Sequence, residues 1–166
     1  MLSKILGEAL FSFNSTCTFI LRPHNIYGPR MGMKHVIPQL LQKVYYENSS
    51  ELDLYSPKHT RAFCYIDDAI NFIERLLKLK ENRKTEILNI GNSEEEISME
   101  KLAKIILKVT NKKLKINKLF NTEGSPKRRC PKIKKVMDLT NYKPKYDIFS
   151  GLKKTFEWYK KNEFKN

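Results

Sequence analysis

The sequence predicts an α/β protein with a mostly parallel sheet. Short segments rich in β-branched and aromatic residues alternate along the 166 residues with longer segments whose apolar residues recur every three or four positions. This alternation is typical of βαβ units. One strand-like segment runs directly into a polar loop, from Leu21 to Arg30, that carries Arg, His, Asn and Tyr. Because ligands of α/β proteins bind at the carboxyl ends of the strands, this loop is the first candidate for a binding site.

The first 66 residues are expected to contain two helices and three strands. A helix over residues 3–13 places Leu6, Leu10 and Phe13 about one turn apart, and a strand follows at residues 16–21. Pro38 suits the first turn of a second helix. The apolar face of that helix is Leu40, Leu41, Val44 and Tyr45. Residues 51–55 alternate between polar and apolar side chains, as a half-buried strand does, and residues 61–66 form a third strand.

The remaining residues continue the alternation. Asp67 or Asp68 is expected to cap a helix, and Ser98 to cap another. Residues 86–90 and 114–117 read as strands, and a last helix closes the chain. The apolar residues expected to face inward are Ile70, Ile73, Leu76 and Leu77 in the first of these helices, Met99, Leu102, Ile105, Ile106 and Val109 in the second, and Leu152, Phe156 and Tyr159 in the last.

Two stretches between these elements are expected to be irregular. Residues 94–96, three glutamates in a row, read as a solvated turn before the Ser98 cap. Residues 117–147 contain a basic loop at 124–135 and are rich in Lys and Pro, so we expect this stretch to wrap over a surface without joining the core.

Composition limits the kind of protein and its partners. The length fits one domain, and no apolar run approaches the ~20 residues that span a bilayer. The net charge is +14, but lysines outnumber arginines 25 to 7 and are scattered, which indicates a solvated surface and no nucleic-acid partner. A partner that carries phosphate remains compatible with this charge. The three cysteines are far apart, so we expect a cytoplasmic protein without disulfides.

Neither a phosphate-binding glycine loop nor a metal site is indicated by the sequence. The six glycines form no GxGxxG and no GxxxxGK[ST] pattern, so independent binding of a dinucleotide is not expected. The three histidines, His24, His35 and His59, lie in different loops without the spacing of metal ligands. We therefore expect no metal.

Five segments together resemble the extended short-chain dehydrogenase/reductases, the NAD-dependent nucleotide-sugar epimerases and dehydratases. Each segment is similar to one motif of that family, and the five occur in the family's order. The motifs are YxxSKxxGE, LRxxNxYGPR, RxFxY[VI]xD[AL], [FLY]N[IVL]G and [SD]PxRRxPDI. The matching segments are residues 3–8, 21–30, 61–69, 88–92 and 125–133.

The resemblance implies the C-terminal half of a Rossmann-like enzyme, with a small α/β substrate-binding subdomain. The remnant of the Rossmann sheet is expected at about residues 1–30 and 60–92, and the substrate-binding part at about 31–59 and 93–166. The family oxidises a nucleotide sugar transiently with NAD, through a 4-keto intermediate, and ends in epimerisation, dehydration or decarboxylation. Two of the matching segments, Phe-Cys-Tyr at 63–65 and Arg-Arg-x-Pro at 128–131, resemble the decarboxylase and dehydratase branch slightly more than the epimerases.

The resemblance also assigns residues to roles. Lys4 matches the lysine that assists the catalytic tyrosine, but that tyrosine would fall one residue before Met1, so the isolated chain is expected to be inactive. NAD is expected to contact Lys4, Pro23 and His24 in the complete enzyme and not to bind this chain stably. The residues expected to bind the nucleotide-diphosphate sugar are Asn25, His35, Val36, Tyr55, Arg61, Arg128 and Arg129.

Within that set, guanidinium groups suit a diphosphate because they bind phosphate oxygens bidentately. Arg61 is one clamp, and either Arg128 or Arg129 is the second. Tyr55 is expected to stack on the base, unless it is a core residue of its strand. Here the sequence departs from the family, because Ser56 to Thr60 stand where the family has a glycine-rich turn. The sequence therefore does not predict which nucleotide base is bound.

A second hypothesis is a non-catalytic nucleotide-sugar-binding or scaffold fragment that pairs with a separate N-terminal half. A homodimer is another possible arrangement, because half of a parallel sheet leaves an apolar edge. No membrane partner is expected.

Overall fold

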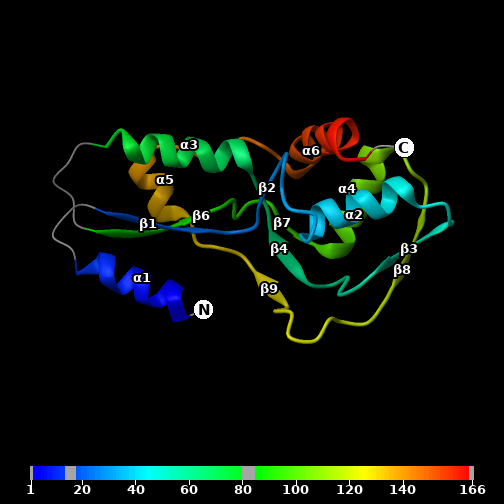
Figure 1. Ribbon diagram of the computed structural model, residues 1–166, viewed down its shortest axis with the longest axis horizontal. Coiled ribbons are helices and arrows are strands. Elements are labelled where there is room, and N and C mark those ends of the chain that lie inside the picture. The colour runs from blue at the N-terminus through cyan, green and yellow to red at the C-terminus, as the bar shows by residue number, and fades with distance from the viewer. Residues whose placement is uncertain (1, 14–17, 80–84, 165–166) are drawn as a thin grey trace.

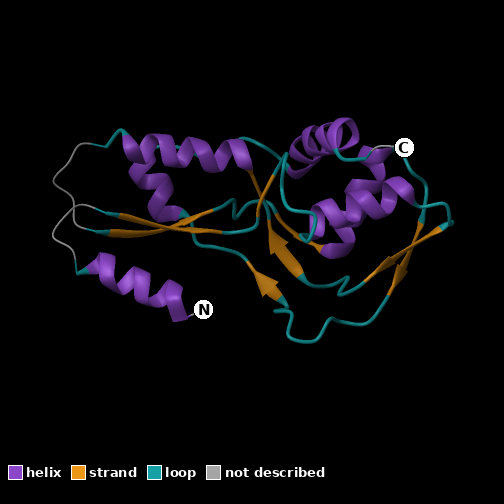
Figure 2. Cartoon of the chain, in the orientation of Figure 1, coloured by secondary structure: helices purple, strands orange, loops and turns teal. Residues whose placement is uncertain are grey.

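The computed structural model describes residues 2–13, 18–79 and 85–164. It is an elongated α/β structure in which helices lie at both ends and short strands lie between and beneath them (Figures 1 and 2). Four small sheets contain the strands, and four of the five strand pairings are parallel. The predicted class is therefore confirmed.

One end of the molecule is built on a two-stranded parallel sheet. Strand β1 (Phe19–Pro23) pairs with β6 (Glu86–Ile90) over five residues. Helices α3 (Ile66–Leu77) and α5 (Lys134–Thr140) pack beside this sheet. Their shared core contains Cys64, Phe72, Leu76, Leu88, Val136 and Tyr142.

The other end is mainly helical. Helices α2 (Val36–Tyr46), α4 (Met99–Thr110) and α6 (Ile148–Asn162) pack together, and β3 (Glu51–Leu54) pairs in parallel with β8 (Lys115–Lys118). Strand β3 alternates between exposed and buried side chains, as its sequence predicts. Large buried side chains here include Ile37, Leu41, Leu52, Leu102, Ile106, Leu152 and Tyr159.

Between the two ends lie five short strands. Strand β4 (Thr60–Ala62) pairs antiparallel with β7 (Glu96–Ser98) and in parallel with β9 (Arg128–Arg129), and β2 (Ile26–Tyr27) pairs in parallel with β5 (Cys64–Tyr65). The expected single strand at 61–66 is thus two strands, because β4 and β5 pair with different partners and α3 already begins at Ile66.

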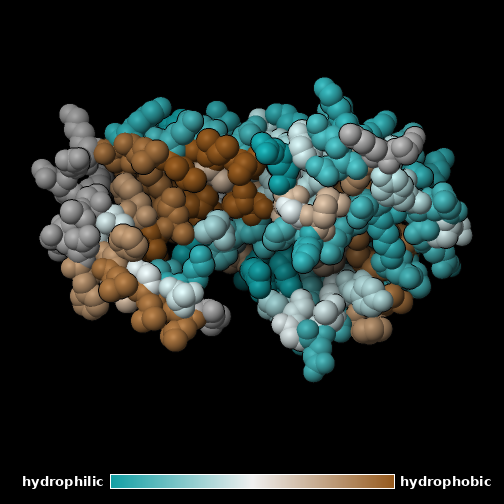
Figure 3. Space-filling model, viewed as in Figure 1, coloured by the Kyte–Doolittle hydropathy of each residue, from teal (hydrophilic) through white to brown (hydrophobic). Residues whose placement is uncertain are grey.

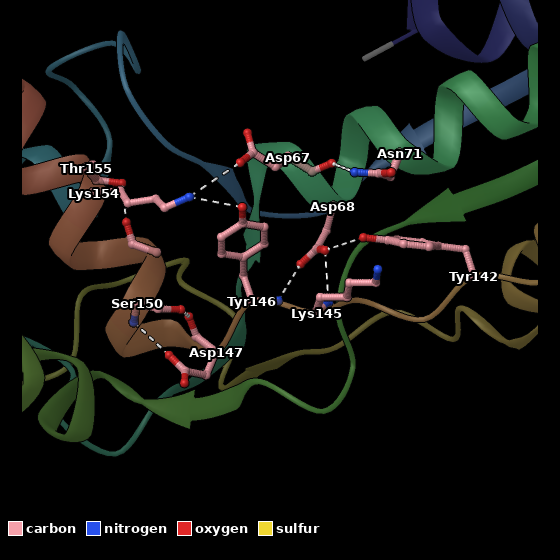
Figure 4. Close-up of polar contacts among 11 residues, drawn as sticks. Asp67, Asp68, Asn71, Tyr142, Lys145, Tyr146, Asp147, Ser150, Lys154 and Thr155 are labelled. Atoms are coloured by element: carbon pink, nitrogen blue, oxygen red, sulfur yellow. Dashed lines mark hydrogen bonds and ion pairs between the residues drawn. The ribbon is translucent and has the colours of Figure 1, made fainter.

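A buried carboxylate ties the two ends together (Figure 4). The side chain of Asp68, in the first turn of α3, is fully buried. Its oxygens accept hydrogen bonds from the Tyr142 hydroxyl at 2.7 Å, the Lys145 amide at 2.9 Å and the Tyr146 amide at 3.1 Å. Because residues 142–146 connect α5 to α6, these bonds fix how the chain passes from one end to the other.

Helix caps agree with the sequence at Ser98 but not at Asp67 or Asp68. The Ser98 hydroxyl accepts from the Lys101 amide at 3.1 Å. In α3 the N-cap is Tyr65, whose side chain forms no capping bond. The prediction of an aspartate cap is wrong, because Asp68 is committed to the 142–146 segment.

The predicted inward face of α3 is confirmed at Leu76 but wrong at Ile70, Ile73 and Leu77. Its buried residues are Asp68, Ala69, Phe72 and Leu76. Ile70 is 44% exposed, Ile73 38% and Leu77 77%. Apolar residues occur at helical spacing on both faces of this helix, so the spacing alone does not say which face packs on the sheet.

The two stretches expected to be irregular contain regular structure. Glu96 is in β7 and Glu95 accepts a hydrogen bond from the Ile148 amide at 2.9 Å, so residues 94–96 are not simply a solvated turn. Within 117–147, helix α5 and the buried side chains of Ile133, Val136 and Tyr142 belong to the core.

Helix α1 (Leu2–Ser12) confirms the first predicted helix but buries none of its residues. Its Glu8 pairs with Arg22 of β1, which lowers the pKa of the Glu8 carboxyl. None of the described helices is long and apolar enough to cross a membrane.

Candidate functional site

A cavity of about 510 Å³ lies beside β4, between the end of β3 and helix α2. Arg61, Arg129 and Ser125 line one part of it, and Leu54, Tyr55 and Met99 line another. Its volume lies within the usual range for small-molecule sites, and it combines an apolar surface with a few polar groups, as such sites do.

The pairing of β4 with β9 brings two guanidinium groups to this cavity. Arg61 lies directly opposite Arg129 in the parallel register, and both line the cavity. Two like charges at such a position repel each other. Burial and the charge of Arg129 together lower the pKa of Arg61.

No carboxylate neutralises this pair in the described part of the chain. The Arg61 guanidinium donates to the Thr60 carbonyl at 2.7 Å and to the Ser125 hydroxyl at 2.9 Å, which fixes its position. Neither Arg61 nor Arg129 forms an ion pair there. Two uncompensated cations at one cavity form a site for an anion with more than one negative charge.

Arg128 is not part of this pair. Adjacent residues of a strand point to opposite faces, so Arg128 lies on the other side of β9. Its guanidinium forms two hydrogen bonds with the Glu96 carboxylate, at 2.9 and 2.7 Å. The Arg128 and Thr60 side chains hold the pKa of Glu96 at about 2. The structure thus places Arg129 at the cavity, whereas the sequence left the two arginines as alternatives.

Tyr55 lies at the cavity with its ring accessible. The side chain is 48% exposed, so the alternative of a core residue is wrong. Its ring meets the Phe120 ring edge-on, with centroids 5.2 Å apart. This contact holds the Tyr55 ring in place at the cavity, where it can stack on a flat group.

A second cavity of about 520 Å³ adjoins the first. Asn25, Val36, Phe63 and Arg129 line both, and His35 and Pro23 line the second alone. Asn25 has a positive φ of 44° and donates from its side-chain amide to the Ala62 carbonyl at 2.8 Å. Arg129 is therefore one of four residues that separate the two cavities and line both.

Two of the residues expected to contact NAD lie elsewhere. Lys4 lines a third cavity, between α1 and the start of β1, that shares no lining residue with the other two. The His24 ring lies 3.3 Å from the Asn89 side-chain oxygen, and only Pro23 lines the second cavity. These three residues do not line one space, so they do not by themselves form a dinucleotide site.

Several cavity residues were missed from the sequence. His59, Ser56 and Gln39 line the first cavity, although no motif includes them. The sequence carried no strand pattern that pointed to His59, because it precedes the expected strand at 61–66 and lies just before β4 in the structure. In the residues that the structure describes, no group of His, Cys, Asp and Glu side chains could hold a metal ion.

Comparison with known proteins gives one matching family description. Residues 2–91 match the NAD dependent epimerase/dehydratase family. The chain is 31% identical over 136 residues to UDP-glucuronic acid decarboxylase 3 of Arabidopsis thaliana, which covers 80% of this chain and 38% of that protein. It is 31% identical over 169 residues to UDP-N-acetyl-alpha-D-glucosaminuronate decarboxylase of Bacillus cytotoxicus, covering 95% of this chain and 50% of that protein.

A solved structure agrees with this match. UDP-glucuronic acid 4-epimerase from Bacillus cereus, in complex with UDP-glucuronic acid and NAD, superimposes with a TM-score of 0.76 at 28% identity. The alignment covers 86% of this chain and 45% of that one. The chain therefore spans half or less of the length of these matched proteins.

Proposed function

Because this chain belongs to the NAD-dependent epimerase/dehydratase family, we propose that it forms the nucleotide-sugar-binding part of an enzyme that modifies a UDP-, dTDP- or GDP-sugar through a 4-keto intermediate. The observation that carries the proposal is the Arg61–Arg129 pair, which lines the same cavity as Tyr55 without a carboxylate partner in the described ranges. A nucleoside diphosphate is complementary to this cavity. Its two phosphates can pair with the two guanidinium groups, and its flat base can stack on the Tyr55 ring.

The matched proteins support a UDP-sugar as the preferred ligand. The two curated relatives are decarboxylases of UDP-sugar acids, and the solved structure contains UDP-glucuronic acid. The two curated relatives favour the decarboxylase branch within the proposal, whereas the solved structure is that of an epimerase. In this arrangement Arg61 and Arg129 hold the diphosphate, Tyr55 stacks on the base, and the sugar extends into the adjoining cavity beside Asn25, His35 and Val36.

The redox step is proposed to require more than this chain supplies. In the family NAD accepts a hydride from the sugar, with Lys4 as the candidate assisting lysine. Lys4 lines a cavity apart from the proposed sugar site, and Pro23 and His24 do not join it there. We therefore propose that this chain alone neither holds NAD stably nor turns over a nucleotide sugar.

A non-catalytic binding fragment that pairs with a separate N-terminal half is the second candidate function. The exposed apolar residues of α1 and α3 favour such a partner: Leu10 is 73% exposed, Phe11 55% and Leu77 77%. Figure 3 shows hydrophobic atoms gathered over the end of the molecule where these two helices lie. A second copy of the chain is the other possible occupant. The mass of the purified chain in solution separates the two, because a dimer supports the second copy and a monomer supports a separate half.

The cytoplasmic location is also part of the proposal. Of the described cysteines, Cys64 is buried and Cys130 partly buried, and both are unpaired, which suits a reducing compartment.

The test of the site is calorimetric titration with UDP. Arg129→Ala is expected to weaken UDP binding at least about tenfold, because it removes charge-assisted hydrogen bonds to phosphate. Arg128→Ala is the matched control: it changes the net charge equally, one residue away, but on the opposite face of β9. Equal affinity of the two variants, or no UDP binding by the unmodified chain, would overturn the proposal.

A further inference from the structure

The Nδ1 atom of His59 is a buried polar atom without a partner. Among the residues that the structure describes, it is the one buried side-chain nitrogen or oxygen that forms no hydrogen bond. The whole residue is only 5% exposed. A buried polar atom without a hydrogen-bond partner destabilises the folded protein by about 1–3 kcal/mol. Because His59 lines a cavity, a ligand in that cavity could supply the missing partner.

The backbone around His59 is firmly held while its side chain is not. The His59 amide donates to the Ser56 carbonyl at 3.0 Å, and the His59 carbonyl accepts from the Met99 amide at 2.9 Å. The Ser56 hydroxyl accepts from the Thr122 amide at 2.9 Å, which ties the turn to the neighbouring segment. The position of the imidazole is therefore fixed by its surroundings and not by a bond of its own.

His59 directly precedes β4 and lines the first cavity together with Arg61 of that strand and Tyr55. If the guanidinium groups hold a diphosphate, the rest of the ligand extends within a cavity that His59 and Tyr55 also line. His59 lines only the first cavity, the one that contains Tyr55, whereas Arg129 lines both cavities.

We infer that the His59 imidazole forms a hydrogen bond with the nucleoside part of the ligand, and so contributes to selection of that nucleoside. The inference rests on the proposed function, since it takes the cavity to hold a nucleoside diphosphate. Rotation about the Cβ–Cγ bond, a broad torsion in histidine, exchanges Nδ1 with Cδ2 at little cost. A ligand group that meets the ring nitrogen then removes the cost of the unpaired atom, and a ligand without such a group does not.

The turn before β4 places a buried imidazole in the cavity wall. A purely structural histidine would be expected to bond to the protein through Nδ1, which His59 does not do.

The test compares two probes, UDP and inorganic pyrophosphate, by calorimetry. His59→Leu removes the ring nitrogens at similar volume and is expected to weaken UDP binding about tenfold while leaving pyrophosphate binding unchanged. His59→Asn keeps a polar atom near the position of Nδ1 and is expected to retain most of the UDP affinity. Melting temperature checks the fold of each variant, and His59→Leu is expected not to lower it, because no protein hydrogen bond is lost.

The possible outcomes distinguish a failure of the His59 inference from a failure of the proposed nucleotide-sugar-binding function. If the unmodified chain binds UDP and His59→Leu binds it equally well, the inference is overturned and the proposed site stands. If His59→Leu weakens UDP and pyrophosphate by the same factor, His59 acts on the phosphates and the inference is again overturned. If the unmodified chain binds neither probe, the proposed function fails and the inference fails with it.

Discussion

Replacing Asp68 by alanine is expected to lower the free energy of unfolding by about 4 kcal/mol. The carboxylate is fully buried and accepts three hydrogen bonds, from the Tyr142 hydroxyl and the amides of Lys145 and Tyr146. Hydrogen bonds to a charged acceptor contribute ~1.5–3 kcal/mol each. The sum is not fully realised, because the three donors share one acceptor group and are not independent.

The loss should be visible in thermal and urea unfolding followed by circular dichroism. For a chain of this size, 4 kcal/mol corresponds to a fall in melting temperature of roughly 8–16 °C. The dependence of the unfolding free energy on urea concentration should stay the same, because the surface exposed on unfolding does not change. The segment from Tyr142 to Tyr146 should also become accessible to protease, since Asp68 anchors it to α3.

Asp67→Ala is the matched control for this experiment. It removes the same charge from the adjacent residue, but the Asp67 carboxylate is partly exposed and its nearest cation, the Lys154 ammonium, is 3.9 Å away. Exposed pairs of this kind contribute ~0–1 kcal/mol. Equal destabilisation by Asp67→Ala and Asp68→Ala would refute the argument that the buried hydrogen bonds hold the two ends together.

Two further predictions concern pH and packing. The pKa of Glu96 is held at about 2, below its ordinary 4.5, mainly by Arg128; this contribution to stability is therefore complete above about pH 4.5 and is lost as the pH falls toward 2. Glu96→Gln should flatten the fall in melting temperature over that range, and an unchanged pH profile would contradict the assignment. Gly151→Ala should cost ~1–3 kcal/mol by overpacking, because its Cβ would lie against the Tyr27 ring, with the ring carbon Cζ at 2.9 Å. Gly7→Ala is the control, because a Cβ there meets no other atom, and it should not destabilise the protein. Urea unfolding measures both variants. If the two variants have the same free energy of unfolding, the close contact with Tyr27 is not the reason for glycine at position 151.

Much of the architecture could be predicted from local patterns. The alternation in β3, the capping serine before α4 and the strand at 86–90 all follow from spacing within a few residues. The family resemblance depends on motif order along the chain, and the match over residues 2–91 confirms it. These features need no information about which elements become neighbours.

The faces of α3 could not be predicted in this way. Ile70 and Ile73 have the same helical spacing as Ala69 and Phe72, but only the second pair packs against the β1–β6 end of the molecule. The phase of a helix is decided by the elements against which it packs, and periodicity reports only that apolar faces exist.

The amino-acid pattern was sufficient to predict the fold class, the family and a set of arginines whose guanidinium groups suit phosphate. The three-dimensional arrangement was needed to show that Arg129, and not Arg128, shares a cavity with Arg61, because that depends on the register between β9 and β4. It also decided that His59 lies in the cavity wall with an unpaired nitrogen. For the arginines the cause is pairing between segments far apart in the sequence, where a shift of one residue turns a strand's side chains to the opposite face. For His59 the cause is the position of the turn before β4 against the cavity.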